Sequence, residues 1–382
     1  MGGVAPTDSP IRTAGSPGST ATPPRVDLEA IWPYVPGRHR SEIARQYGVT
    51  DILKLASNEN PLGPSPRALA ALRESLGEAH YYPDSQAREL REAIAERLGL
   101  TIEHVVIGSG SVECIDLVAR AFLRPGDRAI VGFPSFARFT IACQVVGAEV
   151  VTVPHRNWTF DLDGVADAID DRTRVVFLDN PCNPTGTHVP DAEITAFLDR
   201  IPERVLVVLD RAYYEFVPPD QRSTDDLARI RAGANLVALR TFSKAFGLAG
   251  LRIGYAVTRP EHARVLNRVR EAFNTSSVAQ AAALAAIDDQ AHVAETVATI
   301  AVEREWLSRA YDRLGVVWVP STTNFLFVDL GEHSSEINEG LLRRGIIIRP
   351  MTHPSIAGWA RISVWNRSGN QRLIAALEDL IG

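Results

Sequence analysis

The sequence predicts an α/β protein: a mainly parallel sheet covered by helices, followed by a smaller α+β unit. Three observations carry this prediction. The 382 residues are 45% hydrophobic and 23% charged, the composition of a folded chain long enough for two domains. From about residue 65, helical and strand patterns alternate along the chain. Several strand patterns end in polar or glycine-rich turns, as strands do at the ligand-binding edge of an open parallel sheet.

Short apolar runs separated by helical patterns predict the buried strands of this sheet. These runs cover residues 105–107, 129–131, 149–153, 175–178, 205–209 and 236–239. Apolar residues three and four positions apart predict helices over 66–77 and 87–98. The turns that follow the strands cover residues 108–111, 179–186, 210–211 and 240–244. Because the carboxyl ends of parallel strands share one edge, we expect these turns to meet.

The C-terminal part of the chain predicts a separate unit. An alanine-rich helical stretch begins after about residue 275 and reaches about residue 314, followed by strands at 324–329, 345–349 and 360–364. The first 25 residues alternate Gly, Pro, Ser and Thr, which is typical of a disordered tail. The expected domains are a tail (1–25), an arm belonging partly to the small domain (26–60), a large domain (61–275) and a small domain (276–382).

Composition and spacing exclude several classes of protein. The 40 basic and 46 acidic residues give a charge of −6, which offers no positive field for nucleic acid. No apolar run has the roughly 20 residues of a membrane span, and no signal peptide is recognisable, so we expect a cytoplasmic protein. Cys114, Cys143 and Cys182 form no Cys-x-x-Cys pair, and the nine histidines lack metal-binding spacing. We expect packed cysteines and no metal.

Lysine occurs in this chain only at positions 54 and 244, so nearly all basic residues are arginines. Arginine stays protonated at ordinary pH, whereas a lysine amine can lose its proton and attack a carbonyl. Each lysine can equally be a solvated surface charge. Lys244 follows a predicted strand directly, which places it at the ligand-binding edge and favours a chemical role.

Five residues at or just beyond strand ends carry the functional prediction: Asn183 in NPTG, Asp210 and Tyr213 in DRAYYEF, Lys244 in TFSK, and Arg252 in GLAGLRIGY. Singly, each is explained by a turn, a helix cap or the core. Together they meet the needs of pyridoxal phosphate, which must be held at its ring nitrogen, phenolic oxygen, phosphate and aldehyde.

Each predicted contact suits the chemistry of its side chain. Asp210 would keep the pyridine nitrogen protonated, and Asn183 and Tyr213 would hydrogen-bond the phenolic oxygen. Lys244 would bind the aldehyde and later move the substrate's α-proton. The phosphate would take donors from the helix start after Gly110 and from the residues Ser111, Thr241, Ser243 and Arg252. Residues 108–113 lack the third glycine of a dinucleotide loop and the Gly-Lys-Ser/Thr of a P-loop.

The chain resembles the fold-type I pyridoxal-phosphate enzymes, and among them the histidinol-phosphate aminotransferase subfamily. The matching motifs are NENPLGP, YYPD, NPTG, TFSKAFGLAGLRIGY, GIIIRP and PSIAGWARISV, in this order from residue 54 to residue 364. The resemblance implies an aspartate aminotransferase-like fold with a seven-stranded sheet in the large domain. It also implies pyridoxal 5′-phosphate as cofactor, an amino donor and a 2-oxo acid as substrates, and a homodimer with shared active sites.

The resemblance extends these roles to further residues. It makes Lys244 the Schiff-base lysine and Asp210 the pyridinium partner, stacks Phe136 on the ring, and carries Tyr82 to the phosphate of the neighbouring subunit. Val112 contributes its backbone amide to the phosphate loop. The residues implied near the substrate are Arg361, Arg349, Asn58, Tyr34 and Asn324.

Three departures from the family pattern are visible. Arg211 stands where family members usually have a glutamate, so it either points to solvent or competes for Asp210. Val112 replaces a common aspartate of the phosphate loop. Trp365 and Asn366 replace a small Gly-Thr pair, which would reshape the substrate pocket.

The sequence therefore predicts an aminotransferase, with histidinol phosphate and 2-oxoglutarate as the first substrate pair. Three alternatives stay open: an aromatic or specialised biosynthetic aminotransferase, a decarboxylase of the threonine-phosphate type, and a non-catalytic cofactor-binding regulator. The decarboxylase differs in which bond to the α-carbon lies perpendicular to the ring, which the sequence does not determine. The regulator would need a DNA-binding domain, and a 25-residue tail is too short for one.

Overall fold

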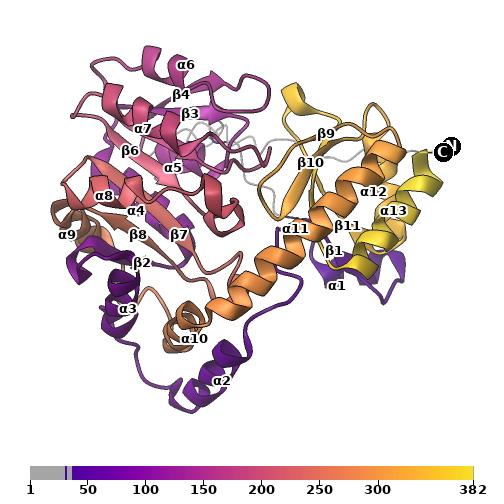
Figure 1. The fold of residues 1–382 in the computed structure, drawn as a ribbon, viewed down its shortest axis with the longest axis horizontal. Helices are drawn as coiled ribbons and strands as arrows, with labels where there is room; N and C mark the ends of the chain where they lie inside the picture. The colour runs from indigo at the N-terminus through magenta and orange to yellow at the C-terminus, as the bar shows by residue number, and fades with distance from the viewer. Residues whose placement is uncertain (1–30, 32–36, 382) are drawn as a thin grey trace, which may run out of the picture.

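The computed structural model describes residue 31 and residues 37–381. The predicted tail and Tyr34 lie outside the described residues. The chain forms a large domain around a seven-stranded sheet and a smaller domain around an antiparallel sheet, and the long helix α11 (Gln290–Arg313) runs from one to the other (Figure 1).

The seven strands of the large sheet lie in the order β2-β8-β7-β6-β5-β3-β4. They are β2 (Val105–Gly108), β8 (Gly254–Thr258), β7 (Leu236–Thr241), β6 (Leu206–Asp210), β5 (Thr173–Asp179), β3 (Arg128–Phe133) and β4 (Glu149–Pro154). All six strands predicted for the large domain are confirmed. The α/β fold with a mainly parallel sheet is also confirmed, because β8 alone runs antiparallel to its neighbours in this sheet.

Strand β8 is the one large-domain strand that the sequence did not predict. A parallel return after β7 would need a crossover of about a dozen residues or more, usually containing a helix. Residues 242–253 hold only the single 3-10 turn 249–251, so the chain returns in the opposite direction. This short return keeps residues 241–252 folded over the sheet edge.

Helices cover both faces of the large sheet (Figure 1). They are α3 (Arg88–Leu98), α4 (Gly110–Phe122), α5 (Arg138–Val145), α6 (Leu162–Asp167), α7 (Asp191–Arg200), α8 (Asp225–Arg231) and α9 (Pro260–Val269). The helix predicted over 66–77 forms α2 (Pro66–Ser75) and a 3-10 turn, and the helix predicted over 87–98 forms α3. Ser65 caps α2 by accepting from the Ala68 amide, and proline at the first helical position favours the start.

The long alanine-rich stretch forms two helices rather than one. Helix α10 (Ser277–Asp288) packs against α2 and α3 at the lower edge of Figure 1, and α11 then crosses to the small domain. The break lies at Asp289, whose carboxylate accepts the His292 amide and caps α11. Aspartate is a favoured capping residue, so the break is encoded locally.

The small domain contains a four-stranded antiparallel sheet and a separate two-stranded parallel pair. The sheet has the order β12 (Arg349–Pro350), β13 (Trp359–Ser363), β10 (Phe325–Asp329), β9 (Trp318–Val319). The pair joins β1 (Leu53–Lys54) to β11 (Ile346–Ile347). Its helices are α1 (Arg40–Tyr47), α12 (Ser334–Arg343) and α13 (Arg367–Ile381). The strand expected over 345–349 is thus split, and its first half pairs with the N-terminal segment.

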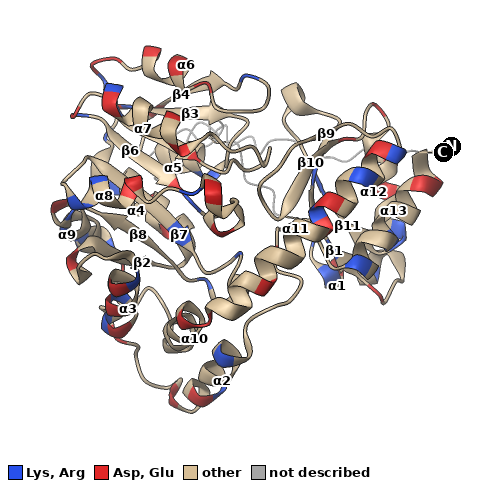
Figure 2. Cartoon of the chain, in the orientation of Figure 1, with Lys and Arg blue, Asp and Glu red and all other residues tan. Residues whose placement is uncertain are grey.

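Apolar strands fill the centre of the molecule, while charged residues of both signs lie along the outer helices (Figure 2). The three cysteines are free and buried, so their predicted packing role is confirmed. No helix among the described residues is long and apolar enough to cross a membrane. Across residues 37–381 there is also no group of three or more His, Cys, Asp or Glu placed to hold a metal.

Candidate active site

A cavity of about 250 Å³ lies at the carboxyl ends of the parallel strands, where the predicted turns meet. Most predicted site residues line it: Asn58, Ser111, Val112, Phe136, Asn183, Asp210, Tyr213, Thr241, Ser243, Lys244, Arg252 and Arg361. A larger cavity of about 800 Å³ lies among Trp158, Trp318 and Trp359, but its described lining contains no lysine. Side-chain chemistry rather than size therefore identifies the candidate site.

Lys244 reaches into this cavity from the turn after β7. Its Nζ donates to the Ser57 carbonyl oxygen at 3.0 Å and lies 5.7 Å from the centre of the Tyr213 ring. Burial, assisted by the positive charge of Arg361, lowers the pKa of Lys244 to about 7. Its amine is therefore available as a nucleophile near neutral pH. The other lysine, Lys54, forms an ion pair with Glu59 at 2.5 Å and lines a different cavity.

Two buried carboxylates face the cavity from adjacent parallel strands, Asp210 ending β6 and Asp179 ending β5 in register with it. Burial, reinforced by the charge of Asp179, raises the pKa of Asp210 to about 7. Burial also raises the pKa of Asp179 to about 6. Asp179 was not predicted as a site residue, although VVFLD ends in aspartate just as VVLD does. It accepts from the Ser135 hydroxyl at 2.8 Å and the Asn183 amide at 2.7 Å.

One wall of the cavity joins the two domains. Arg361 of β13 donates to the Asn183 side-chain oxygen and to the Ala56 carbonyl oxygen, the latter at 2.8 Å. Asn58 donates from Nδ2 to the Tyr213 hydroxyl at 2.8 Å. Asn183 and Tyr213 are thus each bonded to a side chain from outside the large sheet, so the position of the small domain affects both.

The opposite end of the cavity has the features of an anion site. Helix α4 begins at Gly110, and a Cβ at this position would collide with the guanidinium of Arg252. Arg252 also donates to the Ser243 hydroxyl at 3.3 Å, and the Ser243 amide donates to the Thr241 hydroxyl at 3.1 Å. Helix-start amides, a guanidinium and hydroxyls together suit a phosphate.

These groups fit pyridoxal phosphate: a lysine amine for the aldehyde, a buried carboxylate for the ring nitrogen, and an anion cradle for the phosphate. When bound, this cofactor withdraws electrons from the α-carbon of an attached substrate. The protein's part would be to orient the substrate, to exclude water, and to move a proton at that carbon, for which the Lys244 amine is suited.

Four predicted residues do not line the cavity. Asn324 is fully buried and donates to the Asn58 carbonyl oxygen at 3.0 Å, so it supports Asn58. Arg349 lies opposite Arg361 on β12, where the strands pair. Tyr82 is 82% exposed, with its ring 4.7 Å from that of Phe273, while Tyr34 lies outside the described residues. Their roles stay predictions.

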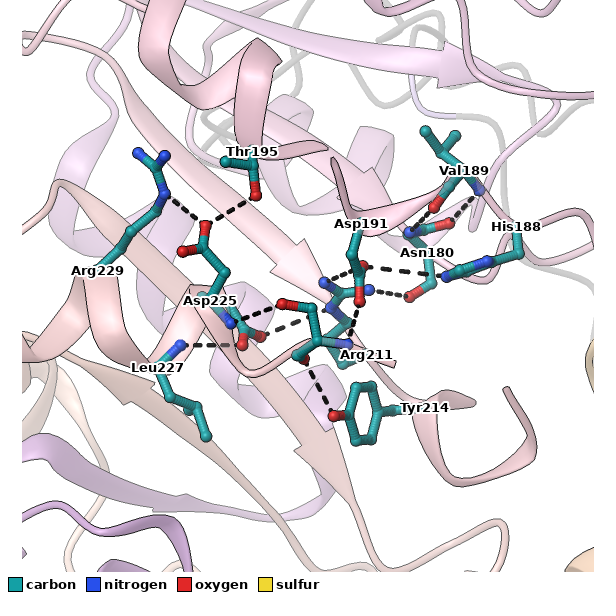
Figure 3. A network of polar contacts seen from close by, with 12 residues as sticks. Asn180, His188, Val189, Asp191, Thr195, Arg211, Tyr214, Asp225, Leu227 and Arg229 are labelled. Atoms are coloured by element: carbon teal, nitrogen blue, oxygen red, sulfur yellow. Dashed lines mark hydrogen bonds and ion pairs between the residues drawn. The ribbon is translucent and has the colours of Figure 1, made fainter. Parts of the chain in front are cut away.

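One expectation about departures from the family pattern is wrong. Arg211 neither points to solvent nor pairs with Asp210: its side chain is 2% exposed and lies 2.7 Å from Asp191 and 3.6 Å from Asp226 (Figure 3). The reason is strand alternation, which sends neighbouring side chains to opposite faces. Trp365 lines the cavity around Lys54, which shares Glu59 with the cavity around Lys244, so its effect on the substrate pocket stays a prediction.

Comparisons with known proteins agree with this chemistry. The sequence profile of the family "Aminotransferase class I and II" matches residues 50–377. A histidinol-phosphate aminotransferase of Moorella thermoacetica is 43% identical over 97% of each chain. One from an Anaeromyxobacter species is 45% identical over 94% of this chain and 99% of its own.

Solved structures share the fold. The crystal structure of histidinol-phosphate aminotransferase from Sinorhizobium meliloti, in complex with pyridoxal 5′-phosphate, has a TM-score of 0.87 and 32% identity, and the match covers 95% of this chain and 98% of that one. A Thermus thermophilus aspartate aminotransferase mutant has a TM-score of 0.78 and 25% identity, with 89% and 94% covered. The chain belongs to the class I and II aminotransferases and is a transaminase whose cofactor is pyridoxal 5′-phosphate.

Proposed function

We propose that this enzyme exchanges an amino group between histidinol phosphate and a 2-oxo acid, with 2-oxoglutarate as the first candidate. The observation that carries the proposal is the cavity that gathers Lys244, Asp210, Asn183 and Arg361. Relatives 41–45% identical over more than nine-tenths of this chain bear the name histidinol-phosphate aminotransferase, which supports this substrate.

In this proposal the residues of the cavity hold different parts of the cofactor, and Lys244 also moves a proton. Lys244 binds the cofactor covalently and then moves the proton at the substrate's α-carbon. Asp210 holds the ring nitrogen, and Asn183 with Tyr213 holds the phenolic oxygen. Ser111, Val112, Thr241, Ser243 and Arg252 hold the cofactor phosphate, and Phe136 stacks on the ring.

The substrate lies beside Arg361, whose planar guanidinium suits a carboxylate or a phosphate. Asn58 and Asn324 form the wall behind it, since Asn324 supports Asn58. Arg349 is the second anion contact, because it lies directly opposite Arg361 on the neighbouring strand and such partners share one face of a sheet.

An absorbance titration tests the substrate. The protein is loaded with pyridoxal phosphate and then titrated in turn with L-histidinol phosphate, L-glutamate, L-phenylalanine and L-phosphothreonine. We expect the visible band of the bound cofactor to be bleached by L-histidinol phosphate and by L-glutamate, and to return when 2-oxoglutarate is added.

Other outcomes name other functions. Bleaching by L-phenylalanine but not by L-histidinol phosphate would indicate an aromatic aminotransferase. Release of carbon dioxide from L-phosphothreonine without a 2-oxo acid would indicate a decarboxylase. A band that no amine changes would contradict the proposed substrates while leaving the cofactor site intact.

We further propose a cytoplasmic homodimer with shared active sites. Large apolar side chains are exposed along the segment 62–82, namely Leu62, Leu76, Tyr81 and Tyr82, and the exposed Phe273 ring lies 4.7 Å from that of Tyr82. The segment around Tyr82 is tied to the segment around Phe273, because Arg270 and Gln280 donate to the Ser85 and Asp84 carbonyl oxygens at 2.9 Å. An apolar surface of this kind is typical of an interface.

Sedimentation and cofactor binding together test this assembly. We expect a mass of two chains, and a Tyr82→Phe protein that stays dimeric but binds pyridoxal phosphate more weakly. The phenyl ring preserves packing while the hydroxyl that would reach the partner's phosphate is lost. A monomeric native protein with full activity would contradict the proposal.

A further inference from the structure

Arg211 lies on the reverse side of the strand end that carries Asp210. The two residues are consecutive, so their side chains leave the sheet on opposite faces. Asp210 lines the site cavity, whereas the Arg211 side chain is buried between α7, α8 and the segment that follows β5 (Figure 3).

The guanidinium of Arg211 contacts both ends of one loop. This loop, residues 180–190, leaves β5, brings Asn183 to the cavity and leads into α7, and it is called the Asn183 loop below. At its start, Arg211 Nη1 donates to the Asn180 carbonyl oxygen at 3.4 Å. Just past its end, Arg211 Nη2 lies 2.7 Å from Asp191 Oδ1.

The base of the Asn183 loop is closed by a second set of bonds. Asn180 donates from Nδ2 to the Val189 carbonyl oxygen at 2.9 Å and accepts the Val189 amide at 2.8 Å. Asp191 in turn accepts the Ser223 amide at 2.7 Å. Moving either end of the loop therefore disturbs several bonds, and Arg211 joins both ends to the end of β6.

The charges around Arg211 are balanced only with an arginine at this position. Asp226 Oδ2 lies 3.6 Å from Arg211 Nε and 3.8 Å from Arg240 Nη2, so two arginines face the two carboxylates Asp191 and Asp226. A glutamate, the usual family residue here, would leave three buried carboxylates facing one arginine. The reversed charge at position 211 thus belongs with the aspartates on α7 and α8.

We propose that Arg211 is a positioning residue that fixes the separation of Asn183 and Asp210 by holding both ends of the Asn183 loop against the end of β6. The inference rests on the proposed function, in which these two side chains contact the cofactor's phenolic oxygen and ring nitrogen. Arg211 acts through the loop and touches neither cofactor nor substrate.

The Asn183 loop also reaches the small domain, which widens the effect of Arg211. The Gly186 carbonyl oxygen accepts the Thr322 amide at 2.9 Å, and Asn183 accepts from Arg361. A displaced loop would therefore shift Arg361 as well. Both the cofactor contact and the substrate contact depend on the same two loop ends.

A double-mutant cycle on cofactor binding tests the proposal. Cofactor-free protein is titrated with pyridoxal phosphate, and Kd is measured for the native protein, Arg211→Gln, Asn183→Ala and the double variant. We expect Arg211→Gln to weaken binding by about tenfold, as the loss of a partner behind a direct ligand commonly does. Asn183→Ala should then add little in the Arg211→Gln background, because the loop is already displaced.

Matched variants separate positioning from general loss of stability. Leu341→Ala removes a fully buried side chain from α12 in the small domain, and Arg229→Gln removes an arginine that pairs with Asp225 and Asp199 on the outside of α8. Both should leave Kd within about twofold of native, because Leu341 lies in the other domain and the ion pairs of Arg229 are with neither end of the Asn183 loop. An Arg211→Gln protein with native Kd, or additive effects of Arg211→Gln and Asn183→Ala, would overturn the proposal.

If Arg211→Gln does not fold, Asp191→Asn replaces it in the cycle. This variant weakens the contact at one end of the loop only, so a smaller loss of affinity, again non-additive with Asn183→Ala, is expected. Native Kd in Asp191→Asn, or additivity, would overturn the proposal equally. Failure of the proposed function looks different: a native protein that takes up no pyridoxal phosphate contradicts the site itself rather than the role of Arg211.

Discussion

The two faces of the end of β6 accommodate buried charge in opposite ways. On the cavity face, burial raises the pKa of Asp210 to about 7 and lowers the pKa of Lys244 to about 7, so both groups are pushed toward their neutral forms. On the reverse face, Arg211 has carboxylates at 2.7 and 3.6 Å. On the cavity face, the protein compensates the charges of Asp210 and Lys244 poorly. On the reverse face, nearby carboxylates compensate the charge of Arg211.

This difference separates groups kept for a ligand from groups kept for the fold. A buried charge without a close partner is unfavourable, and proteins usually pair it or neutralise it. The cavity residues gain their partners when the cofactor brings a cationic ring nitrogen and an anionic phosphate. The charged groups around Arg211 form ion pairs with one another inside the protein. Groups with shifted pKa values in a cavity therefore indicate a functional site, whereas an equally buried cluster of ion pairs indicates a structural role.

The largest expected effect separates the two lysines. Lys244→Ala should reduce turnover by about 10³-fold or more, because it removes both the nucleophile and the proton-moving amine. Lys54→Ala should change turnover by only a few-fold, because Lys54 lines another cavity and contacts the candidate site only through Glu59, which lines both. Steady-state kinetics of both variants with the same substrates provide the measurement. Equal effects from the two substitutions would contradict the assignment of the site.

The next effect is on stability at the reverse face. Arg211→Gln should lower the free energy of unfolding of the cofactor-free protein by about 3–5 kcal/mol, because Asp191 loses its arginine and Asp226 keeps only Arg240, at 3.8 Å. Urea unfolding followed by circular dichroism at pH 7.5 measures this change. A loss below about 1 kcal/mol would mean that water already screens the cluster.

At the cavity face, removing a charged side chain should raise the free energy of unfolding rather than lower it. Folding raises the pKa of Asp210, so its ionisation lowers stability as pH rises from about 4, its unfolded value, through about 7. Asp210→Asn should therefore stabilise the cofactor-free protein by on the order of 4 kcal/mol at pH 8 and by almost nothing at pH 4. Unfolding curves at both pH values check this. The same variant should bind pyridoxal phosphate more weakly, since an amide cannot retain the proton on the ring nitrogen.

The sequence identified the cavity face well and the reverse face poorly. Asn183, Asp210 and Lys244 each follow an apolar run, and strand ends that share an edge must meet. Their convergence could therefore be predicted from local patterns. The contacts of Arg211 with Asp191 and Asp226 depend on where α7 and α8 pack, which no local pattern states. An arginine in DRAYYEF looked like a surface charge for that reason.

The same limit explains the remaining misses in the fold and the site. The split of residues 345–349 between two pairings depends on β1, which is almost 300 residues away in sequence. The antiparallel direction of β8 agrees with the absence of a crossover helix from its connection, residues 242–253. Asp179 could have been found, because it repeats the strand-end pattern of Asp210. Contacts between segments that are far apart in the chain cannot be predicted from local sequence patterns.

A smaller effect concerns the rate at which cofactor attaches to Lys244. The folded protein holds the pKa of Lys244 near 7 by burial and then by the charge of Arg361, so the neutral amine predominates above pH 7. The rate should rise about tenfold per pH unit below pH 7 and level off above it. With an ordinary lysine, the rate would keep rising up to about pH 10. Arg361→Gln should shift the pH at which the rate levels off to a higher value, because it removes a positive charge that lowers the pKa of Lys244. Stopped-flow absorbance from pH 5.5 to 9 measures both curves.

The smallest expected effect sharpens the comparison within the reverse face itself. Arg229 lies on the same helix as Asp226 and pairs with Asp225 at 2.7 Å and Asp199 at 2.8 Å, distances as short as that between Arg211 and Asp191. Its side chain is 25% exposed, against 2% for Arg211. Because water can replace its partners, Arg229→Gln should lower the free energy of unfolding by less than about 1 kcal/mol. Matching losses for Arg229→Gln and Arg211→Gln would show that distance rather than burial sets the strength of these ion pairs.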